Sequence, residues 1–111
     1  MKAKQVTIKE NSWLAKLAAI KLGEKKMAMV LGRTIHLHNT TAQEFLQDEK
    51  WLKHELKHIE QYRRHGVVGF LSRYLLESVK KGYHHNKFEK EARACECEES
   101  LEENSIRFKI K

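Results

Sequence analysis

The stretch WLKHELKHIEQY, residues 51–62, sets two histidines four positions apart, with a glutamate directly after the first. Leu52, Leu56 and Ile59 recur at helical spacing, which predicts a helix over about residues 48–64. This helix is the starting point for the expected fold, because it would place both histidines on the same side.

A helix advances about 100° per residue, so His54 and His58 lie about 40° apart and one turn apart along its axis. Two imidazoles placed in this way can bind one metal ion. Glu55 is adjacent to a ligand, and its carboxylate can reach a metal-bound water without binding the metal. This is the H-E-x-x-H pattern of zinc metallopeptidases, in which the glutamate is the general base. The five letters alone are explained as well by a solvated polar helix face, and the charged Lys57 between the histidines favours that alternative.

A catalytic zinc needs a third protein ligand and one open position. The stretch NKFEKEARA, residues 86–94, lies on a second predicted helix, over about residues 86–103, and offers Glu89 and Glu91. These two glutamates are about 200° apart on a helix, so only one of them can face the metal. The helical periodicity leaves the choice open, because both flank the apolar face.

An H-E-x-x-H helix followed after a few dozen residues by a helical E-x-x-A resembles the gluzincins, the peptidase class of thermolysin. At this length the chain resembles most closely the minigluzincins and related small zincin-like domains. The resemblance covers about residues 34–95, through TIHLHN, HELKHIEQY and FEKEA. It implies a zincin fold with Zn²⁺ bound by His54, His58 and Glu89. It also implies that Glu55 is the catalytic base in the hydrolysis of peptide bonds.

The chain departs from the gluzincin pattern at one position. Gluzincins often have an aspartate four residues after the ligand glutamate, where it orients a ligand histidine, and this chain has Arg93 there. We expect another carboxylate or a backbone carbonyl to replace it.

TIHLHN, residues 34–39, resembles the edge strand that pairs with substrate, which makes His36 and His38 candidate substrate-binding residues. Solvent-facing polar positions are the favoured alternative for both.

An oxyanion donor is the remaining requirement of such a site. Tyr83, His84 and His85 precede the glutamate helix and are the nearest candidates, although an ordinary loop role is favoured for each.

The other segments predict an α+β fold, a single compact zincin-like domain over residues 1–111 in which a small sheet packs on the histidine helix. The further expected elements are a helix over 11–22 with the apolar stripe Trp13, Leu17 and Ile20, a hairpin of MAMVL and TIHLH, a helical turn from the capping box TAQE at 41–44, a helix over 67–81 with Val67, Leu71, Tyr74, Leu75 and Val79 inward, and a C-terminal strand over about 105–110.

The C-terminal SIRFKIK alternates apolar and basic residues. An ordinary sheet strand is the favoured interpretation. The alternative is that this strand lies along the substrate strand, blocks the cleft and keeps the enzyme latent.

The cysteines and the hydropathy of the chain indicate the compartment in which we expect the protein. Cys95 and Cys97 would point to opposite sides of a helix, and two such cysteines indicate a reducing compartment. No segment resembles a signal peptide or is apolar enough to span a bilayer, so we expect a cytoplasmic protein.

The leading hypothesis is a zinc metallopeptidase acting on a peptide or protein, and the second is an inactive zincin-like module for zinc or protein binding. The formal charge of +7 supports a third, a basic nucleic-acid binder, which lacks any recognition motif.

Overall fold

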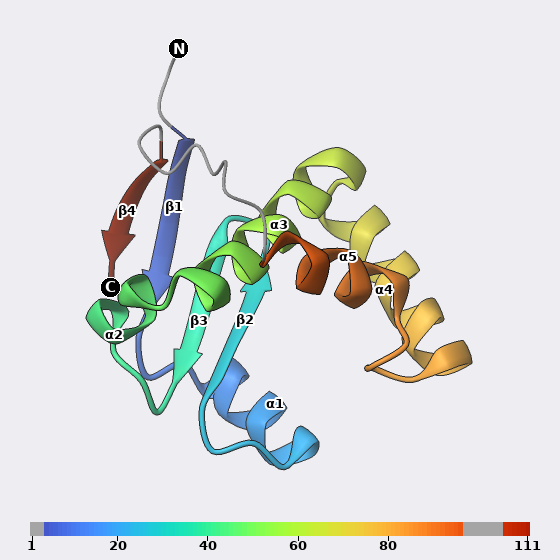
Figure 1. The fold of residues 1–111 in the computed structure, drawn as a ribbon, viewed down its shortest axis with the longest axis horizontal. Coiled ribbons are helices and arrows are strands. Elements are labelled where there is room, and N and C mark those ends of the chain that lie inside the picture. Colours follow the sequence, from blue (N-terminus) through green and yellow to red (C-terminus); the bar gives the residue numbers. More distant parts are fainter. Residues whose placement is uncertain (1–3, 97–105) are drawn as a thin grey trace.

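The computed structural model describes residues 4–96 and 106–111, which form a single α+β domain, as predicted (Figure 1). The elements are β1 (Lys4–Lys9), α1 (Trp13–Leu22), β2 (Met27–Leu31), β3 (Thr34–His38), α2 (Ala42–Gln47), α3 (Glu49–His65), α4 (Val67–Lys81), α5 (Lys87–Cys95) and β4 (Ile106–Ile110).

Several helices begin and end where the sequence provides caps. The Ser12 side chain accepts a hydrogen bond at the start of α1, and Gly23 ends that helix in the left-handed conformation with φ of 71°. Thr41 caps α2, which confirms the predicted capping box. Asp48 caps α3, and Gly66 follows its last residue. The helix that carries the two histidines therefore has its predicted position.

The four strands form one mixed sheet in the order β2-β3-β1-β4. β2 and β3 are the predicted antiparallel hairpin, whereas β1 pairs in parallel with both β3 and β4. Strand β1 was not predicted, although its buried Val6 and Ile8 alternate with polar residues. Because β1 lies beside β3, the stretch TIHLH is an interior strand. The expectation that it forms the open edge is wrong, and β2 is the edge strand at that end of the sheet.

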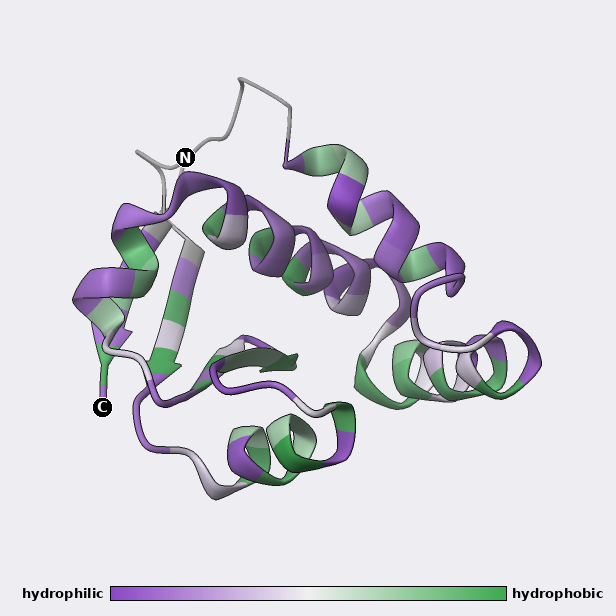
Figure 2. Ribbon diagram, turned by 60° about the horizontal axis from the view of Figure 1, so that its bottom comes forward, coloured by the Kyte–Doolittle hydropathy of each residue, from purple (hydrophilic) through white to green (hydrophobic). Residues whose placement is uncertain are grey.

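The sheet lies between α1 on one face and α3 on the other (Figure 2). Ile35 and Leu37 of β3 are fully buried in the main core with Phe45 of α2 and Leu52 of α3. Helices α4 and α5 both pack against α3. Residues distant in the sequence are thus brought to the histidine helix from two directions.

Helix α1 packs on the sheet through its small residues. Ala15 and Ala19 are buried, and they form a second core cluster with Met27 of β2. The apolar stripe that supports this helix in the sequence is on the opposite side and exposed. Alanine lets the helix approach the sheet closely, so the large side chains are not those that are buried.

Helix α4 also differs from its expected packing. Leu71 and Tyr74 are partly buried against the main core, as expected for inward residues. Val67, Leu75 and Val79 are exposed, so the inward assignment is wrong for these three. Packing on α3 and α5 selects one side of α4, the side that carries the buried Phe70.

The C-terminal strand β4 is an ordinary sheet strand. It pairs in parallel with β1 at the edge of the sheet opposite to β2. The favoured interpretation of an ordinary strand is confirmed, and the alternative, in which this strand lies along the substrate strand, is wrong. Of the predicted helix over about 86–103, α5 covers Lys87–Cys95, and Cys97 and the later part lie outside the described residues.

No helix within residues 4–96 and 106–111 is both long and apolar enough to cross a membrane.

Candidate metal centre

Three predicted ligands meet between α3 and α5. Nε2 of His54 lies 3.0 Å from Oε1 of Glu89, and Nε2 of His58 lies 3.1 Å from the same oxygen. One ligand atom from each of the three residues lies within 4.8 Å of the other two, so this group could hold a metal ion. Glu89 and His58 are buried, at 3 % and 6 % exposure.

The donor atoms and their spacing fit zinc. Two ligands bound at about 2.0–2.1 Å in tetrahedral geometry lie about 3.3 Å apart. The two nitrogen–oxygen distances of 3.0 and 3.1 Å are close to this value. Two imidazole nitrogens and one carboxylate oxygen are also a donor set of catalytic zinc sites with a fourth, open position.

Helix α5 is fixed so that Glu89 faces α3. Asn86 is fully buried and accepts a hydrogen bond from the Phe88 amide, which caps the helix. Its Nδ2 donates to the Tyr74 carbonyl at 3.0 Å and to Ser78 Oγ at 2.8 Å, both on α4. These bonds tie the first turn of α5 to α4 and set the direction of Glu89.

Glu91, the other candidate ligand, faces away from the histidines. Its Oε1 accepts a hydrogen bond from Gln61 Nε2 at 2.9 Å, and its side chain is 44 % exposed. Of the two glutamates left open by the sequence, Glu89 is therefore the one that meets His54 and His58.

Glu96 orients the first histidine. Its Oε2 lies 2.8 Å from Nδ1 of His54, just beyond the end of α5. A carboxylate there accepts a hydrogen bond from Nδ1–H, which keeps the proton on Nδ1 and leaves Nε2 with the lone pair that binds a metal. Glu96 thus supplies the contact expected of another carboxylate in place of Arg93, whose guanidinium donates instead to the His84 carbonyl.

Gln61 orients the second histidine and was missed in the sequence. Its Nε2 donates to the Phe88 carbonyl at 3.1 Å and to the Glu91 carboxylate, which fixes the direction of the amide. Gln61 Oε1 then lies 2.8 Å from His58 Nδ1, which must carry the proton. The available signal in the sequence was a glutamine three positions after the second histidine, on the same side of the helix.

Tyr74 holds the other oxygen of the ligand carboxylate. Its hydroxyl donates a hydrogen bond to Glu89 Oε2. Burial, together with the negative charge of Glu89, raises the pKa of Tyr74 far above its ordinary value, so the hydroxyl remains a donor. Glu89 is thus held by α4 on one side and faces α3 on the other.

The three predicted ligands are electrostatically coupled. Burial lowers the pKa of His54 and His58, but their hydrogen bonds to Glu89 outweigh it and raise both values. Burial raises the pKa of Glu89, but the same bonds hold it well below its usual range. The site thus favours an ionised carboxylate with positive charge on the histidine side, which is the charge pattern that a bound cation would complete.

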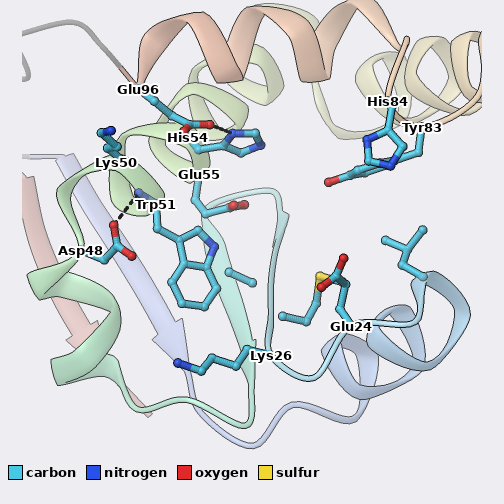
Figure 3. A pocket seen from close by; sticks show the side chains of 13 residues that line it. Glu24, Lys26, Asp48, Lys50, Trp51, His54, Glu55, Tyr83, His84 and Glu96 are labelled. Carbon is cyan, nitrogen blue, oxygen red and sulfur yellow. Dashed lines mark hydrogen bonds and ion pairs between the residues drawn. The ribbon is translucent and has the colours of Figure 1, made fainter.

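Glu55 is buried beside the ligands and lines the cavities next to them. It is 5 % exposed, and burial raises its pKa to about 8. Figure 3 shows Glu55 and His54 on one side of a cavity of about 500 Å³, with Tyr83 and His84 across from them. The side chain is therefore positioned to meet a molecule in that cavity.

A second cavity, of about 560 Å³, reaches His58 and Glu89 and is lined mainly by apolar residues. Met27 and Ala28 of the edge strand β2 line both cavities, as do His54 and Glu55. The two cavities thus adjoin at the metal group and follow β2.

His36 and His38 lie away from this site. Both are on β3 and line neither cavity. His36 is buried at 9 % exposure, and its Nδ1 lies 2.8 Å from Ser12 Oγ at the start of α1. It is a core residue on the α1 face of the sheet, which differs from both the substrate-contact and the solvent-facing expectation.

Tyr83 is the one of the three loop candidates that lines both cavities, and His84 lines the first. In Figure 3 the Tyr83 hydroxyl points across the cavity toward the side of Glu55 and His54. Partial burial, with the negative charges of Glu89 and Glu55, raises the pKa of Tyr83 and keeps its hydroxyl protonated.

Comparison of the chain with protein-family models, with curated proteins and with solved structures found no match.

Proposed function

We propose that this protein is a zinc-dependent peptidase of the gluzincin type, with His54, His58 and Glu89 as ligands. The observation that carries the proposal is the convergence of both histidine Nε2 atoms on Glu89 Oε1, at 3.0 and 3.1 Å. Zinc bound by these residues would supply a Lewis acid and lower the pKa of a bound water to about 7.

Glu55 is the general base in this proposal. It follows a ligand histidine on α3, is not itself in the ligand group, and lines both cavities. Its carboxylate would take a proton from the attacking water and deliver it to the leaving amine.

The edge strand β2 is the proposed peptide-binding strand. It pairs with β3 on one side, and its residues line the cavities on either side of the metal group. An extended peptide can add to such an edge through main-chain hydrogen bonds. This placement would set a scissile carbonyl near Glu55, with Tyr83 opposite as a donor to the developing oxyanion.

The test is Glu55→Gln, compared with Glu60→Gln on the same helix. Glu60 pairs with Arg64 at 2.9 Å and is outside the ligand group. We expect Glu55→Gln to keep stoichiometric zinc and to lose cleavage of a peptide library, while Glu60→Gln keeps both. Zinc binding without cleavage in the unaltered protein would instead identify a zinc-binding module without catalysis.

A further inference from the structure

Helix α1 carries an exposed apolar stripe with no partner among the described residues. Trp13, Leu17 and Ile20 are 64 %, 55 % and 68 % exposed. They lie on the side of the helix opposite to Ala15 and Ala19, which are buried on the sheet. The stripe is therefore a property of the folded domain and does not belong to its core.

Lysines flank this stripe on both sides. At about 100° per residue, Lys16 and Lys21 lie about 70° to either side of its centre. Both are exposed. Long lysine side chains in such positions can lie along an apolar surface while their ammonium groups reach outward to polar groups.

Helix α4 presents a second exposed apolar surface, next to the larger of the two cavities. Val68, Leu75 and Val79 are 78 %, 60 % and 84 % exposed and share one side of the helix. Leu75 and Val79 line the larger cavity from α4, and Leu22 lines it from α1. Hydrophobic segments on both helices are visible in Figure 2. Because Leu75 and Val79 face this cavity, they are kept separate from the stripe on α1. We use the term α1 surface for Trp13, Leu17 and Ile20 with the flanking Lys16 and Lys21.

Basic residues outnumber acidic ones in and just after α1 and in α4, as they also do in α3 and β4. Residues 13–26 contain four lysines and one glutamate, and α4 contains three basic residues and one glutamate. These segments thus carry +5 of the formal +7 of the chain.

We propose that the α1 surface docks on an anionic lipid surface. Exposed tryptophan and aliphatic side chains suit the boundary between headgroups and acyl chains, and lysines beside them suit anionic headgroups. A second copy of the chain would bring its own Lys16 and Lys21 against these two lysines, which opposes self-association. A nucleic-acid backbone would match the charge but offers no partner for the aliphatic side chains. The inference is independent of the proposed peptidase activity.

The test is co-sedimentation of the full chain with vesicles of phosphatidylcholine containing phosphatidylglycerol, against vesicles of phosphatidylcholine alone. We expect binding to the anionic vesicles that weakens with salt. Leu17→Asp with Ile20→Asp should abolish it. Lys16→Gln with Lys21→Gln should weaken it about 30-fold. The matched pair Lys109→Gln on β4 with Lys111→Gln just after it should leave binding nearly unchanged.

A second measurement follows the Trp13 side chain directly, through its fluorescence. In a Trp51→Phe background, Trp13 is the remaining tryptophan, and its emission should shift to the blue with anionic vesicles. The proposal is overturned by a lack of vesicle binding, by equal loss in both lysine pairs, or by preferred binding to a DNA duplex in competition with the vesicles. A concentration-dependent dimer that forms through Leu17 and Ile20 without vesicle binding would also overturn it.

Discussion

Glu96 Oε2 lies 2.8 Å from Nδ1 of His54, while Nε2 of the same ring lies 3.0 Å from Glu89. One imidazole is thus held between a carboxylate that orients it and the carboxylate that completes the metal group. The two glutamates are seven positions apart, one in the first turn of α5 and one at its end. Both ends of α5 therefore act on one histidine of α3.

This relationship predicts the effect of Glu96→Gln. The amide can turn its oxygen to His54 but carries no charge, so it raises the basicity of the ring less. We expect zinc affinity to fall by roughly 10- to 100-fold, as measured by competition with a chelator. Glu60→Gln, on the outer side of α3, is the control and should bind zinc as the unaltered protein does. Equal affinities in the two variants would mean that Glu96 does not support the site.

The hydroxyl of Tyr74 provides a second prediction. Tyr74→Phe removes the hydrogen bond to Glu89 Oε2 while keeping the ring that packs against Phe70 and Phe88. A hydrogen bond to a charged group contributes about 1.5–3 kcal/mol, so zinc affinity should fall by roughly 10- to 100-fold. Tyr62→Phe on α3 is the matched control. An affinity loss of the same size in Tyr62→Phe would assign the effect to packing.

Tyr83→Phe separates metal binding from catalysis. If Tyr83 donates to the oxyanion, its loss should lower kcat by about 10²–10³ with zinc content and KM nearly unchanged. His85→Gln, in the same exposed loop, should leave kcat as it was. An unchanged kcat in Tyr83→Phe would remove this residue from the mechanism.

His36 predicts a dependence of stability on pH away from the metal group. Burial, and secondarily the positive charge of Lys9, lower the pKa of His36 below its ordinary value of 6.5. The unfolded chain then binds a proton at a higher pH than the folded one, so the free energy of unfolding should decrease as the pH falls through 6.5.

His36→Asn should show a weaker decrease over that range in denaturant titrations of the metal-free protein, since the asparagine does not titrate. His38→Asn, whose side chain lies on the same strand and is only partly buried, is the control. Identical pH dependence in His36→Asn and the unaltered protein would contradict the assignment of the decrease to His36.

The site was largely predictable because its signals are local. The spacing of His54 and His58 places two candidate ligands within one helical turn, and helix caps can be identified within a few residues. Helical periodicity alone could not decide between Glu89 and Glu91, because the direction of Glu89 depends on how Asn86 ties α5 to α4.

Other features depend on contacts between distant segments. Alternation in TIHLH is the same for an edge and an interior strand, and only pairing with β1 distinguishes them. The stripe on α1 is a regular helical pattern, but the alanines on the opposite side are what pack on the sheet. Apolar spacing predicts a helix more reliably than it predicts which face is buried.

Mass spectrometry of the metals that remain bound to the purified protein after gel filtration tests whether His54, His58 and Glu89 hold zinc. Glu89→Gln and Glu91→Gln make the same chemical change two positions apart on α5, and only the first touches the histidines. We expect one zinc per chain in the unaltered protein and in Glu91→Gln, and little or none in Glu89→Gln. Absence of zinc in the protein after incubation with the metal, or zinc retained equally by both variants, would contradict it.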